Sequence, residues 1–175
     1  MNVITKNIGK FFIALVVASF AFCLAGCQKE LTGKEAVEEY ESIEAVELLK
    51  NEAASDLGDM VHISYEISQS ESDDTKLSLY EDLVKKNTEI DRVCNDLINL
   101  KGYPKACEDL QSHLAESAEN VKKSAECFER AGFYYMQGNM NTGTKRVNEA
   151  NEYTDSASDA VAKYNEAKDA LLEQQ

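Results

Sequence analysis

Apolar residues recur at steps of three and four along most of the chain, and the first such segment runs from Glu35 to about Ser68. Its apolar positions are Ala36, Tyr40, Ile43, Val46, Leu49, Ala53, Leu57, Met60 and Ile67. This spacing predicts one long amphipathic helix. Thr32 and Glu35 fit a capping box at its start, and Gly58 is where we expect a bend.

Three further segments show the same helical spacing, over about 74–100, about 104–137, and from a start between 140 and 144 to the end of the chain. Gly102 and Pro104 separate the first two of these, and Gly138 ends the next, as is typical of helix ends and starts. The last segment alternates small residues with tyrosine at its apolar positions, which predicts a close approach between helix backbones.

The four segments predict an all-α fold, namely an antiparallel up-down four-helix bundle of long helices, because short loops make consecutive helices antiparallel neighbours. No strand-like alternation of apolar and polar residues occurs. Three helices with a bent first one remain the alternative. We assign the bundle domain to residues 34–175.

The first residues of the chain have a different pattern. Lys6 and Lys10 precede an apolar run from Phe11 to Cys23, which Ser19 alone interrupts. The run is shorter than the roughly 20 residues that span a bilayer core. A positive start followed by a short apolar run is typical of a secretory signal peptide.

The run ends in Leu24, Ala25, Gly26 and Cys27. This tetrapeptide resembles the lipobox of the bacterial lipoproteins. The resemblance implies cleavage before Cys27, diacylglycerol on its thiol and often a further acyl chain such as palmitate on the new amino terminus. We therefore expect a signal peptide over 1–26 and a lipidated tether over 27–33, with covalent lipid as the one attached group and no cofactor.

The same resemblance implies a location in the bacterial cell envelope, anchored in a membrane and extracytoplasmic. Position 28 is Gln rather than Asp. The sorting pattern of the family then implies the outer membrane if the host has two membranes, and otherwise the outer face of the plasma membrane.

The chain is acidic: 18 Lys and Arg face 32 Asp and Glu, a formal charge of −14. Loss of Lys6 and Lys10 with the signal peptide makes the mature charge −16, since residues 1–26 contain no acid. With no basic cluster, the sequence excludes nucleic-acid binding. The charge either steers a basic protein partner to the surface or keeps the exported protein soluble.

The mature region holds Cys94, Cys107 and Cys127. Cys94 and Cys107 flank the turn at Gly102, about one helical turn out of level, so they either form a disulfide or remain buried free thiols. Cys127 lacks an obvious partner and is expected to be a packed thiol, with an intermolecular bridge as the alternative.

Candidate catalytic and metal-binding residues are sparse. His62 and His113 each share a helical face with two acids, Asp59 and Glu66 in one case, Asp109 and Glu116 in the other. Neither triplet matches the Glu-x-x-His pattern of di-iron bundles, and both lie beside the apolar stripe. With no nucleophile motif or phosphate loop either, we expect no enzyme and no metal site.

Phe133, Tyr134 and Met136 form an aromatic-rich group with Tyr135 near residue 137. One helix face cannot bury all of them, so Phe133, Tyr134 and Met136 form a candidate contact patch. Packing beneath the loop 138–143 is the alternative.

These observations favour a lipid-anchored, non-catalytic helical bundle that acts through protein–protein contact. The alternative is an envelope protein that binds a small ligand or metal in the bundle core. Asn87, Ser117 and Ser124 would line such a cavity, or else fix the helix register.

Overall fold

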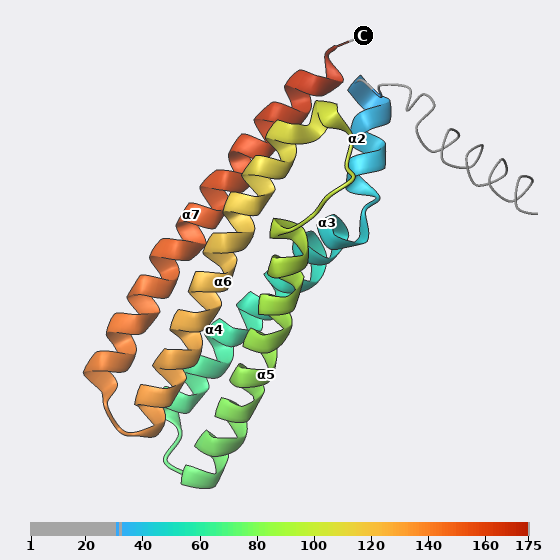
Figure 1. Ribbon diagram of the computed structural model, residues 1–175. Helices are drawn as coiled ribbons and strands as arrows, with labels where there is room; N and C mark the ends of the chain where they lie inside the picture. Colours follow the sequence, from blue (N-terminus) through green and yellow to red (C-terminus); the bar gives the residue numbers. More distant parts are fainter. Residues whose placement is uncertain (1–30, 32, 175) are drawn as a thin grey trace, which may run out of the picture. The chain divides into compact units, whose positions relative to one another are not determined.

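The computed structural model describes residue 31 and residues 33–174, and all regular secondary structure there is helical (Figure 1). The elements are α2 (Gly33–Glu41), α3 (Glu44–Leu48), the π-helix η1 (Leu49–Ala53), α4 (Ala54–Gln69), α5 (Asp73–Ile98), the 3-10 helix η2 (Lys105–Cys107), α6 (Glu108–Met136) and α7 (Met140–Leu172). The expected signal peptide, the lipobox Leu24–Cys27 and the capping residue Thr32 lie outside the described residues. Within residues 33–174, no helix joins enough length to enough apolar character for it to span a bilayer.

The first expected helix is interrupted, which corrects the prediction of one continuous helix over residues 35–68. At Ile43 the backbone is extended, with φ −70° and ψ 125°, and helix resumes at Glu44. Before the break, the hydroxyl of Tyr40 donates a buried hydrogen bond to Gln111 Oε1 at 2.9 Å. Gly58, where a bend was expected, lies inside α4 instead. The break therefore lets α2 and α4 pack on different neighbours.

The other helix limits agree with the sequence to within a few residues. Ser72 Oγ accepts a hydrogen bond from the Thr75 amide at 3.3 Å and caps α5. Asn139 Oδ1 accepts one from the Thr142 amide at 3.2 Å and caps α7. Gly138, with φ +73°, ends α6 in the left-handed region that glycine adopts without strain.

Helix α6 lies at the centre of the packing, because α4, α5 and α7 all contact it. Helices α4 and α5 also contact each other, whereas α4 has no substantial contact with α7. The buried residues of α6 recur along its whole length and include Leu110, Leu114, Ala118, Val121, Ala125, Phe128, Ala131 and Tyr135. This helix thus contributes the largest share of the core, and the others are arranged around it.

Small residues bring α6 and α7 together. Ala150 and Ala160 of α7 are fully buried. The hydroxyls of Ser117 and Ser124 donate hydrogen bonds to the carbonyls of Ala157 and Ala150, at 3.2 and 2.9 Å. These two serines therefore satisfy their hydroxyls by joining the helices.

Helix α2 packs against α7 and η2 near the carboxyl end of α7. Gly33, with φ +53°, lies against the carbonyl oxygens of Leu171 and Gln174, leaving no room for a Cβ. The face of α2 that packs there buries Ala36, Val37 and Tyr40. The beginning and the end of the described domain consequently lie together.

Candidate functional site

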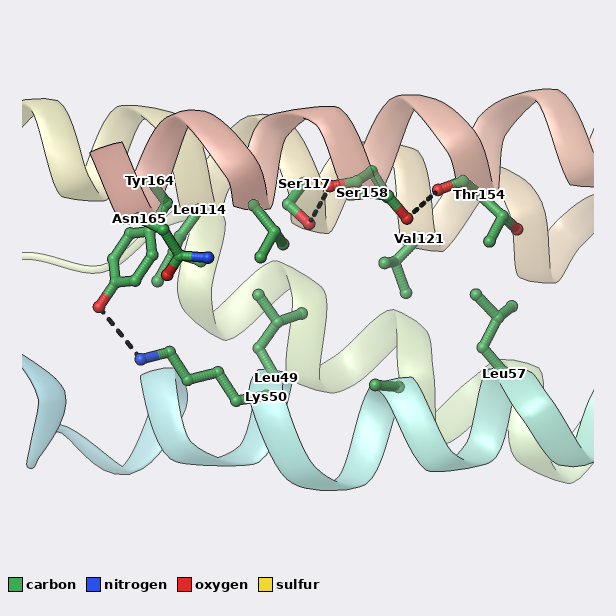
Figure 2. Close-up of a pocket in the computed structure, with 13 residues that line it drawn as sticks. Leu49, Lys50, Leu57, Leu114, Ser117, Val121, Thr154, Ser158, Tyr164 and Asn165 are labelled. Atoms are coloured by element: carbon green, nitrogen blue, oxygen red, sulfur yellow. Dashed lines mark hydrogen bonds between the residues drawn. The ribbon is translucent and has the colours of Figure 1, made fainter. Parts of the chain in front are cut away.

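A groove of about 620 Å³ lies between α4 and α7, with α6 as its floor (Figure 2). The groove exists because α2 packs on α7, whereas α4, which follows it along the chain, packs on α5 and α6 instead. Its lining comes from three segments: Leu49, Lys50, Ala54 and Leu57; Leu114, Ser117 and Val121 on α6; and Thr154, Ala157, Ser158, Val161, Tyr164 and Asn165 on α7.

The groove is apolar and contains no acid. Leucine, valine and alanine side chains make up most of its walls. The hydroxyls of Ser117 and Ser158 donate to the backbone carbonyls of Ala157 and Thr154, so they are already satisfied. Lys50 is the one charged residue among those that line it. In a chain with 32 acidic residues, such a surface is a local exception.

One end of the groove is closed by a polar cluster around the Glu41 carboxylate. Glu41 Oε1 accepts hydrogen bonds from Lys50 Nζ at 2.7 Å, from the Tyr164 hydroxyl at 2.8 Å and from Lys168 Nζ at 2.8 Å. Lys50 Nζ also donates to the Tyr164 hydroxyl at 3.0 Å (Figure 2). The cluster joins α2, η1 and α7.

Partial burial raises the pKa of Glu41, but hydrogen bonds from Lys168, Lys50 and Tyr164 outweigh it and lower this pKa to about 2. Burial, together with the hydrogen bond to Glu41, raises the pKa of the Tyr164 hydroxyl above its ordinary value. At neutral pH the cluster thus holds one carboxylate, two ammonium groups and a neutral phenol, with a net charge of +1.

Exposed apolar side chains continue the groove along both of its edges. Val61 on α4 is 46% exposed and Val161 on α7 is 39% exposed. Val61 lies seven residues from Ala54, on the same face of α4, and Tyr65 one turn further on is also exposed. The exposed apolar surface therefore extends along both helices beyond the groove itself.

The expected contact patch of Phe133, Tyr134 and Met136 is only partly exposed. Phe133 is 39% exposed, whereas Tyr134 and Met136 are half-buried. The Phe133 ring lies 6.1 Å from the ring of Tyr80 on α5 and 5.8 Å from that of Tyr134. Phe133 thus both packs between helices and reaches the surface.

Cys94, Cys107 and Cys127 are buried free thiols in the structure, which has no bond between Cys94 and Cys107. Cys107 Sγ donates instead to the carbonyl of Ala36 at 3.4 Å. Burial raises the pKa of Cys94 to about 12 and that of Cys107 to about 11. Neither is poised as a nucleophile at neutral pH.

The two histidine triplets do not converge on one point. His62 lies 3.4 Å from Glu66, while Asp59 binds Lys86 at 2.7 Å. His113 Nδ1 lies 4.0 Å from Glu116. Over residues 33–174, no three His, Cys, Asp or Glu side chains are grouped as metal ligands.

Sequence reasoning did not identify the groove. The sequence does contain a signal. The face of α4 with Ala54, Gly58 and Val61 has no acidic residue, and the face of α7 with Thr154 and Val161 has none either. Recognising a site also required knowing that these two faces flank the same stretch of α6.

No protein family model matches the chain, and neither a curated protein nor a solved structure does so.

Proposed function

We propose that this chain is a lipid-anchored, non-catalytic lipoprotein of the bacterial cell envelope that acts through protein–protein contact. The observation that carries the proposal is the acid-free, apolar groove between α4 and α7 of a strongly acidic chain. Exposed apolar surface of this kind marks interaction sites on proteins that otherwise remain soluble.

The lipid anchor is supported by the lipobox residues Leu24, Ala25, Gly26 and Cys27 behind a short apolar run. Two or three acyl chains at Cys27 anchor a protein stably, because each buried methylene contributes about 0.8 kcal/mol. The anchor places the domain in the extracytoplasmic part of the envelope, on the outer membrane where the host has one.

We further propose that the domain is an antiparallel up-down four-helix bundle of α4, α5, α6 and α7. Short connections at 70–72 and 137–139 support this arrangement, as does the contact of each helix with the next along the chain. In this arrangement α2 is an additional short helix, seated on one end of α7.

The acidic surface and the uncharged groove have different roles in this proposal. Long-range attraction from the acidic surface speeds the encounter with a basic protein. Burial of the apolar walls then holds the complex, since the core of an interface is depleted of charge and its rim is polar. No catalytic residue is needed for either role.

The anchor is tested by growth of the host with an alkyne-tagged palmitate, followed by gel fluorescence of the purified chain. We expect label on the native protein and its loss in Cys27→Ala. Cys127→Ala, which removes a buried thiol from the domain, is the matched control and should retain the label. Equal labelling of Cys27→Ala would contradict the anchor.

A second candidate function, binding of a small amphiphilic ligand, is favoured by the size of the groove. A volume of about 620 Å³ falls within the range of small-molecule sites, and one end carries net positive charge. Native mass spectrometry of the chain purified from its host tests this candidate: a stoichiometric lipid or fatty-acid adduct would favour it.

A further inference from the structure

The path of the chain around α7 gives the groove its shape. Helix α2 packs on the carboxyl end of α7, with Glu41 beside Tyr164 and Lys168. After the extended residue Ile43 the chain turns to α5 and α6 and leaves α7. Towards its amino end, α7 consequently lacks the helix that α2 supplies near its carboxyl end (Figure 1). The groove therefore lies along α7 directly next to the surface on which α2 packs.

Both edges of the groove repeat apolar or small residues every seven positions. On α7 these are Thr154 and Val161, and on α4 they are Ala54 and Val61. Residues seven apart lie on one helical face, two turns from each other. Because each edge of the groove has this repeat, the side chains on the two edges match the spacing of a third helix placed between them.

We propose that the groove is the seat of one amphipathic α-helix from a partner protein, which continues the line of α2 along α7. The inference rests on the proposed function of protein–protein contact. From Thr154 to Tyr164, α7 rises about 15 Å, which corresponds to roughly three turns of a helix. The partner helix presents apolar residues at i, i+3 or i+4, and i+7 to the groove.

The charges outside the groove specify the flanks of that helix. Asp155 lies one turn from Ser158 and Asp169 one turn from Asn165, both exposed on α7. A partner helix with Lys or Arg beside its apolar face complements these acids. The formal charge of −16 expected for the mature chain opposes the docking of a second copy. A helix with basic residues beside Asp155, and with none facing Lys50 and Lys168 at the other end, is therefore the occupant that the groove and its surroundings favour.

Site-directed photo-cross-linking of the full-length protein in its host tests the seat. Benzoylphenylalanine replaces Val161 in one variant and Ala54 in a second, so that each edge of the groove carries a probe. Val84 on α5 is the matched control position: it is also a valine, is 37% exposed against 39% for Val161, and does not line the groove. We expect the two groove probes to label one partner protein at residues three, four or seven apart, and the Val84 probe not to label it.

A substitution distinguishes binding of a helix in the groove from nonspecific contact with the protein surface. Val161→Asp places a charge in the groove, and we expect it to reduce labelling from the Ala54 probe at least tenfold. Val84→Asp should leave that labelling unchanged. Circular dichroism of both variants shows whether they retain the helical fold.

Three results would overturn the seat: adducts to a second copy of this chain, a bound lipid without any protein adduct, or equal labelling from Val84. If a partner is labelled from Val84 but not from the groove, the proposed contact function stands while the proposed helix-binding site fails. If no position labels a protein although Cys27 is lipidated, the contact function itself fails.

Discussion

The hydroxyl of Tyr164 on α7 donates a hydrogen bond of 2.8 Å to Glu41 at the end of α2, which lies 123 residues earlier in the chain. The same carboxylate accepts from Lys50 and Lys168, so a single side chain joins three segments. Because α2 leads directly into the break at Ile43, this carboxylate fixes the point at which the groove begins. Its removal should therefore affect both stability and the shape of the groove.

Tyr164→Phe is expected to lower the free energy of unfolding by about 1.5 kcal/mol, because the variant loses a hydrogen bond to a charged group. Tyr153→Phe is the matched control, since no hydrogen bond from the Tyr153 hydroxyl occurs within residues 33–174. Urea denaturation followed by circular dichroism measures both. Equal stability of the two variants would contradict the role of the Tyr164 hydroxyl.

Glu41 should make stability depend on pH in the acid range. Its pKa falls from an ordinary value of 4.5 to about 2 in the folded protein, so the unfolded chain binds the proton more tightly. This contribution is fully present above about pH 5 and decreases as the pH falls from 4.5 towards 2. Urea unfolding at a series of pH values measures the slope.

Glu41→Gln should flatten that slope, whereas Glu71→Gln should leave it unchanged, because Glu71 is exposed in the turn between α4 and α5. An undiminished slope in Glu41→Gln would show that other carboxyl groups account for the acid sensitivity.

Two glycines within helices should respond in opposite ways to alanine. A Cβ at Gly143 would overlap the ring of Tyr135, so Gly143→Ala should destabilise the protein by about 1–3 kcal/mol. A Cβ at Gly58 would meet nothing within 4 Å, so Gly58→Ala should stabilise it by about 0.5–1 kcal/mol through helix propensity. Thermal unfolding of the two variants tests the close approach of α6 and α7.

The three buried thiols should resist labelling in the folded protein. An alkylating reagent at neutral pH is expected to modify none of Cys94, Cys107 and Cys127 before denaturation and all three afterwards, without a reductant. Mass spectrometry of the intact chain counts the adducts. Labelling of Cys127 alone after denaturation would show that Cys94 and Cys107 form a disulfide.

The extents of α5, α6 and α7 followed from the sequence because their ends are local. Ser72 and Asn139 cap helices through contacts with residues three positions away, and Gly138 adopts its positive φ within one turn. The break at Ile43 could not be predicted in this way. Apolar residues continue across it at helical spacing, and its basis is tertiary: Tyr40 bonds to Gln111, 71 residues away.

The candidate site was less predictable than the fold. The sequence singled out Phe133, Tyr134 and Met136, and the structure exposes Phe133 most. The groove depends instead on two faces that are far apart in the chain, around Ala54 and Val161. Neither face has a motif, and their common feature is the lack of acidic residues, which periodicity alone does not distinguish from ordinary surface.

Gly33 lies against the last turn of α7, and this contact fixes how far the groove lies from the start of the domain. Measured along α7 from Gln174, Tyr164 is about 15 Å away and Thr154 about 30 Å away, at 1.5 Å per residue. The groove therefore lies between about 15 and 30 Å along α7 from the point at which the chain enters the domain at Gly33. The proposed partner helix consequently lies beyond the last turns of α7, which α2 already covers.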